Sequence, residues 1–137
     1  MNEEIFVFVK WNQADKRVEI DPSSIELTDA VEWVWWVAVG TAADGVAPRP
    51  DVTVSFQGAE KRGPFKKLAA DHGSMMGAGN WGPRAKAPRY SYKVVLHSPD
   101  GPKSGSGLVI NRATKPKPAK ARKGHVVIPQ PPTGPPD

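Results

Sequence analysis

The stretch Val31-Glu32-Trp33-Val34-Trp35-Trp36-Val37-Ala38-Val39 decides the fold prediction. Alternate side chains of an extended strand point to opposite faces, so Trp33, Trp35 and Val37 share one face and the residues between them share the other. Both faces are apolar, which is typical of a central strand covered on both sides. A helix is possible by length, but β-branched and aromatic residues favour strands. We therefore predict a central β-strand here.

Shorter stretches with alternating or continuous apolar character lie on either side of this strand, separated by turn residues. They span residues 5–9, 17–20, 25–27, 52–57, 90–97 and 107–110. Together with the central strand they make about seven strands. This pattern predicts an all-β, antiparallel Greek-key sandwich. Between them, residues 65–70 are predicted to form a short helical turn, and residues 71–88 an irregular Gly- and Pro-rich stretch.

The composition of the chain changes near residue 111. Residues 111–137 hold six Lys/Arg, one Asp and seven Pro, with a single cluster of large apolar residues. Such a segment cannot bury enough apolar surface to offset the entropy of ordering it. We therefore predict a sandwich domain over residues 1–112 and a flexible, disordered tail over residues 113–137.

The residue content excludes several kinds of protein. The chain has no cysteine, so it has no disulfide, zinc–thiolate site or cysteine nucleophile. Its acidic start, Met1-Asn2-Glu3-Glu4, does not fit a secretory signal, and its longest apolar run is far too short to span a membrane. We expect a soluble, cytoplasmic protein with no membrane partner.

Charge is distributed unevenly along the chain. Residues 1–60 hold 4 Lys/Arg and 11 Asp/Glu, whereas residues 61–137 hold 15 and 3. Two interpretations remain open: an acidic sheet face balanced by basic loops, or a basic surface for an acidic partner such as nucleic acid.

The order of these features resembles the cupredoxin-like sandwich. The segment Val31-Glu32-Trp33 is similar to the family's V-x-W strand, Tyr90-Ser91-Tyr92 to its Y-x-Y strand, and Gly107-Leu108-Val109-Ile110 to its terminal strand. The resemblance covers about residues 5–112. An immunoglobulin-like sandwich shows a similar periodicity and is the alternative.

The copper ligands of that family are missing. Blue copper needs two His and a Cys thiolate, yet Val94 stands where the resemblance would place the cysteine. His97 matches the second histidine, and Pro50-Asp51 falls in the region of the first. We predict no metal, no cofactor and no electron transfer.

No set of residues indicates catalysis. Asp71, His72 and Ser74 are close in sequence, but catalytic triads are assembled in space rather than along a loop. Met75 and Met76 could bind copper(I) with His72, although flexible filling of one sandwich end is the simpler interpretation. We predict no catalytic residue and therefore no enzyme.

Trp81 is the first candidate contact with a partner. It lies between glycines, with cations close behind it at Arg84, Lys86 and Arg89. It could be either a plug over the core or an exposed contact. An exposed aromatic beside cations suits recognition of protein or single-stranded nucleic acid.

The tail supplies the second set of candidate contacts. Its basic run could neutralise phosphates, or serve only as a solubilising linker, and its apolar cluster could anchor to another sheet. The candidate residues are Lys115, Lys117, Lys120, Arg122, Lys123, Val126, Val127 and Ile128. We therefore expect a non-enzymatic module that binds a protein partner through its sandwich-end loops and tail. The alternative is a nucleic-acid-binding accessory protein; partner identity, biological process and oligomeric state stay open.

Overall fold

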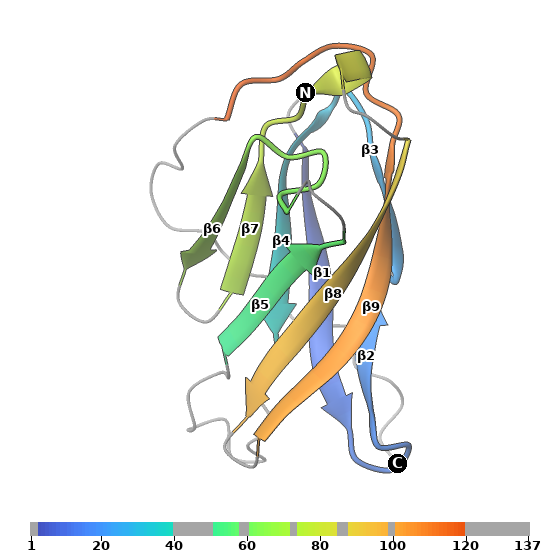
Figure 1. The fold of residues 1–137 in the computed structure, drawn as a ribbon, viewed down its shortest axis with the longest axis vertical. Helices are drawn as coiled ribbons and strands as arrows, with labels where there is room; N and C mark the ends of the chain where they lie inside the picture. Colours follow the sequence, from blue (N-terminus) through green and yellow to red (C-terminus); the bar gives the residue numbers. More distant parts are fainter. Residues whose placement is uncertain are drawn as a thin grey trace.

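The computed structural model describes residues 3–39, 51–57, 61–71, 74–84, 88–98 and 101–119, which form a two-layer β-sandwich (Figure 1). Its strands, in chain order, are β1 (Glu3–Asn12), β2 (Arg17–Asp21), β3 (Ser24–Leu27), β4 (Val31–Ala38), β5 (Asp51–Phe56), β6 (Lys67–Asp71), β7 (Ser74–Ala78), β8 (Arg89–Ser98) and β9 (Gly101–Asn111). A short 3-10 helix, η1, spans Gly82–Arg84. Within these ranges, no helix is long and apolar enough to cross a membrane.

The strands form two mixed sheets. Sheet A has the order β2-β1-β4-β7-β6, and sheet B has the order β3-β9-β8-β5. The Trp-rich strand β4 lies in the middle of sheet A, as its two apolar faces predict. The pairs β1–β4 and β3–β9 are parallel, so the prediction of purely antiparallel sheets is wrong. The alternation of side chains shows which face of a strand is buried, but it does not show whether the adjacent strand runs parallel or antiparallel to it.

Strands β6 and β7 replace the helical turn and part of the irregular stretch expected between residues 65 and 88. Their sequences are rich in Ala, Met and Gly, which carry little strand preference. Pairing with β4 holds β7 extended, and pairing with β7 holds β6 extended, since Met76 of β7 lies opposite Trp35 on one side and Ala69 of β6 on the other. Long-range partners therefore outweigh local preference in this part of the chain.

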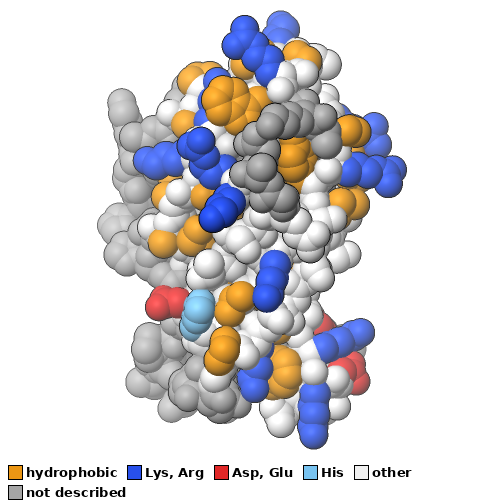
Figure 2. Space-filling model, in the orientation of Figure 1, with side chains coloured by type: hydrophobic (Ala, Val, Ile, Leu, Met, Phe, Trp, Pro, Cys, Tyr) orange, Lys and Arg blue, Asp and Glu red, His pale blue; other side chains and the backbone are white. Residues whose placement is uncertain are grey.

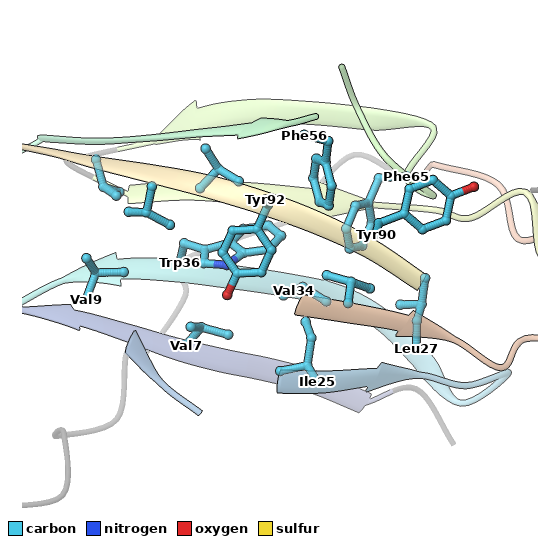
Figure 3. Packing of buried hydrophobic residues seen from close by; sticks show 14 of the residues in the cluster. Val7, Val9, Ile25, Leu27, Val34, Trp36, Phe56, Phe65, Tyr90 and Tyr92 are labelled. Carbon is cyan, nitrogen blue, oxygen red and sulfur yellow. The ribbon is translucent and has the colours of Figure 1, made fainter. Parts of the chain in front are cut away.

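The main core lies between the two sheets, around the Trp36 ring. Trp36 points from β4 toward sheet B, where its ring lies 5.4 Å from Tyr92, 5.7 Å from Phe65 and 6.4 Å from Phe56, each edge to face (Figure 3). Edge-to-face packing suits the charge distribution of aromatic rings. Because Trp36 is fully buried, this aromatic cluster ties the middle of sheet A to β5 and β8 of sheet B.

Candidate binding surface at one end of the sandwich

Four connecting segments meet at one end of the sandwich, which is uppermost in Figure 1. They are residues 28–30, 57–66, 79–88 and 112–119, of which 58–60 and 85–87 lie outside the described residues. Backbone hydrogen bonds join them to one another and to the strand ends: Trp81 N–H donates to Pro64 at 3.2 Å, and Arg112 N–H to Leu27 at 2.8 Å. Segments far apart in sequence thus share one surface.

Residues 112–119, which we call the strap, cross this end from the end of β9 to the end of β7 (Figure 1). The backbones of Asn80 and Lys117 exchange two hydrogen bonds, of 3.0 and 2.9 Å. Gly82 has a φ of +57°, and a Cβ there would lie 2.5 Å from the carbonyl carbon of Lys115. The glycines of this loop therefore serve close packing against the strap. They do not form a phosphate-binding loop.

Asp29, in the turn before β4, anchors the middle of the strap. Its carboxylate accepts hydrogen bonds from the backbone N–H of Thr114 at 2.8 Å and of Lys115 at 3.1 Å, and also from the Thr114 hydroxyl. Lys117 Nζ donates to the Asp29 carbonyl at 3.1 Å. The Thr114 hydroxyl is the main cause that lowers the pKa of Asp29, and the two backbone N–H groups lower it further. Because these donors favour the ionised carboxylate, Asp29 holds the strap as an anion.

Trp81 sits on a tight turn beside the strap. The Asn80 side chain, itself 1% exposed, accepts a hydrogen bond from Gly82 N–H at 2.8 Å, and Arg84 N–H donates to the Trp81 carbonyl at 3.1 Å. The Trp81 ring is 37% exposed, and Lys66 Nζ lies 5.1 Å from its centroid. Of the large apolar side chains in the described residues, Trp81 is the one that is exposed. The turn therefore presents part of an aromatic ring to solvent.

The end is strongly cationic. The described residues of its four segments include seven Lys/Arg and one carboxylate, Asp29, which is already engaged by the strap. One of the seven, Arg112, is paired with Glu26 of β3, its Nε 2.9 Å from the carboxylate oxygen. On the face seen in Figure 2, Lys and Arg side chains lie both at the upper end and in the lower half, whereas the visible acidic side chains lie in the lower half, so the upper end shows cations without acidic neighbours. The seven cations are Lys61, Arg62, Lys66, Arg84, Arg112, Lys115 and Lys117.

The structure brings together several of the predicted contact residues. Arg84, Lys115 and Lys117 share the end with Trp81, and the exposed Arg89 begins β8 next to it. Sequence reasoning missed Asp29 and Lys66, because their roles depend on contacts far along the chain. Predicted contacts that lie outside the described residues are Lys86, Lys120, Arg122, Lys123, Val126, Val127 and Ile128.

The metal-binding alternatives find no geometric support in the described part of the chain. Met76 belongs to the outer face of sheet A, whereas Met75 packs against the core on the inner face, so their thioethers cannot converge on one ion. His97 is exposed on β8, with Nε2 2.9 Å from the Thr53 hydroxyl. His72 lies outside the described residues, and no group of three or more His, Cys, Asp or Glu in the described ranges could hold a metal ion.

Comparison of the chain with protein-family models, with curated proteins and with solved structures finds no match.

Proposed function

We propose that the protein is a binding module whose cationic sandwich end takes an acidic segment of a protein partner. The observation that carries this proposal is that seven cations belong to the segments at the end that carries the partly exposed Trp81, with Lys66 lying 5.1 Å from its ring. An aromatic ring provides contact area, and the surrounding cations steer and orient an anionic partner. The rigid sandwich and the hydrogen-bonded strap hold these groups in place before binding, which lowers the entropic cost of association.

Within all-β sandwiches, we infer the cupredoxin-like, Greek-key type without its copper site. The parallel pairs β1–β4 and β3–β9 support this type over the constant-type immunoglobulin sandwich, in which both sheets are antiparallel. The V-x-W, Y-x-Y and terminal-strand segments of the resemblance all lie in strands, namely β4, β8 and β9.

Nucleic-acid binding is the second candidate function, favoured by the excess of seven cations over one carboxylate. Phosphates would be neutralised by the same Lys and Arg side chains, with strong dependence on salt. Single-stranded nucleic acid is bound on several stacked aromatic rings, whereas this end presents one in the described residues. The geometry therefore favours the protein partner.

The test measures binding of a fluorescent Asp/Glu-rich peptide, and separately of a single-stranded oligonucleotide, by anisotropy over a range of salt. The double variant Lys66→Glu/Lys115→Glu should weaken peptide binding about tenfold, because exposed ion pairs contribute about 0.2–1 kcal/mol each and reversal makes them repulsive. The matched control, Lys16→Glu/Lys93→Glu, changes the net charge equally but lies away from the end.

Equal loss in the two double variants would show that only net charge matters, and would contradict a site at this end. Tighter binding of the oligonucleotide than of the peptide, with a steep salt dependence that the end variant reduces, would replace the leading function with the second.

A further inference from the structure

The face of sheet A that points away from sheet B carries its own apolar cluster. The buried members come from β4 and β7, and Phe6 and Phe8 of β1 and Ala69 of β6 pack against them. The Phe6 and Trp35 rings are stacked, with centroids 6.4 Å apart. A continuous apolar surface therefore crosses four adjacent strands. Its buried members are Trp33, Trp35, Val37, Met76 and Ala78.

The β4 and β7 part of this outer face is almost fully removed from solvent. Trp35 is 1% exposed, Val37 2% and Trp33 5%. In a two-layer sandwich the outward faces normally carry polar residues in contact with water. Every apolar side chain that packs on this cluster among the described residues belongs to sheet A itself, and sheet B lies on the opposite side. No described apolar side chain from outside sheet A therefore packs over these two tryptophans.

We propose that the C-terminal segment 120–137 covers them, docked on the outer face of sheet A of the same chain. The strap ends next to this sheet: a Cβ on Gly79, just past the end of β7, would lie 2.7 Å from the backbone nitrogen of Ala119 (Figure 1). At about 3.3 Å per residue, the seven residues from Ala119 to Val126 span roughly 23 Å, close to the length of β4. The segment can therefore reach across the face.

The residues of the segment suit a sheet face. Val126, Val127 and Ile128 form its one cluster of large apolar residues, and five prolines follow. Proline has no backbone N–H to donate to a sheet edge, so such a segment is better suited to lie on a face than to extend the sheet. The other long segment outside the described ranges, residues 40–50, is tied at both ends between β4 and β5 and holds one large apolar residue, Val46.

The proposal revises the role of the apolar cluster in the tail, independently of the binding function proposed for the cationic end. Composition suggests an anchor for a partner. The buried outer face instead suggests that this cluster packs on sheet A of the same chain.

The absence of cysteine from the chain permits a direct test on the full-length protein. A nitroxide label on His125→Cys should broaden the indole N–H signals of Trp33 and Trp35 in ¹⁵N spectra, with far less effect on Trp81. In the same labelled chain, Val126→Asp/Val127→Asp/Ile128→Asp should restore the two signals. The matched control, Gln130→Asp/Thr133→Asp, should leave the broadening in place.

Two results would overturn the proposal. In a mixture of ¹⁵N chain without label and labelled chain without ¹⁵N, broadening would mean that the tail of a second copy covers the face. If the Trp33 and Trp35 signals of the labelled chain are not broadened, segment 120–137 does not lie on the outer face of sheet A, and a different partner covers that face.

Discussion

The Gly82 residue makes the contact between turn and strap possible. Its positive φ is costly for other residues, and a Cβ would collide with the backbone of Lys115. Gly82→Ala should therefore lower the free energy of unfolding by about 2–4 kcal/mol. It should also shift the amide signals of Thr114 and Lys115 in NMR spectra.

The control for this variant is Gly101→Ala, which also changes a positive-φ glycine but has no neighbouring atom within 4 Å of the new Cβ. It lies at the start of β9, at the other end of the strand from the strap, and should leave the Thr114 and Lys115 signals unchanged. Identical shifts in the two variants would argue against a steric contact at Gly82.

Tyr92 should make the protein sensitive to alkali. Burial is the main cause that raises the pKa of Tyr92 above 10.0, its ordinary value. Because the folded pKa is higher than the unfolded one, this group contributes full stability below about pH 10 and loses it as the pH rises through the folded pKa. Tyrosinate absorbance at alkaline pH should show Tyr92 ionising only as the domain unfolds.

Tyr92→Phe should remove this part of the alkaline loss of stability. Alkaline unfolding curves that coincide for the variant and the wild type would contradict the assignment to Tyr92.

At the scale of elements, strand β4 carries the packing between the sheets. Trp36→Ala removes a ring that contacts Phe56, Phe65 and Tyr92, and should cost about 3–5 kcal/mol in denaturant unfolding. Trp81→Ala, at the partly exposed position, should cost less than about 1 kcal/mol. Similar costs for the two variants would contradict the central position of β4.

The strap should respond to acid through Asp29. Its folded pKa is lowered by the Thr114 hydroxyl and the neighbouring N–H groups, so its stabilising effect is full above the unfolded pKa, near 3.8, and is lost as the pH falls through the folded pKa. The Thr114 and Lys115 amide signals should move over that acidic range in NMR titrations. Asp29→Asn should abolish the movement, whereas Asp51→Asn, on β5, should not; persistence in Asp29→Asn would refute the anchor.

The sequence predicted β8 because alternate residues of that strand are apolar and buried, and β4 because a run of β-branched and aromatic residues suits a strand covered on both faces. It could not predict β6 and β7, whose Ala, Met and Gly become extended only by pairing with distant partners. Sequence periodicity also could not predict that β1 runs parallel to β4. At the candidate binding surface, the sequence indicated Trp81 and three of the seven cations, Arg84, Lys115 and Lys117. It did not indicate Asp29, because the hydrogen bond from Thr114 to Asp29 joins residues 85 apart.

At the scale of the whole molecule, the acidic and basic halves of the sequence do not form separate halves of the structure. The strap brings basic residues from the C-terminal part to the turn that holds Asp29, and its far end lies beside Asn80. The strap therefore adds three cations, Arg112, Lys115 and Lys117, to the four that the other segments supply at this end. The sandwich provides a rigid frame, and the crossing chain provides part of the charge at the end that carries Trp81.

The central claim is that residues 112–119 form a fixed part of this surface, and ¹⁵N relaxation of the full-length protein tests it most directly. The account predicts that the amides of Thr114, Lys115 and Lys117 have order parameters near 0.85, like those of a rigid backbone such as β8 and β9. Order parameters below about 0.6 from residue 113 onward would contradict it, since the cations would then form a flexible tail.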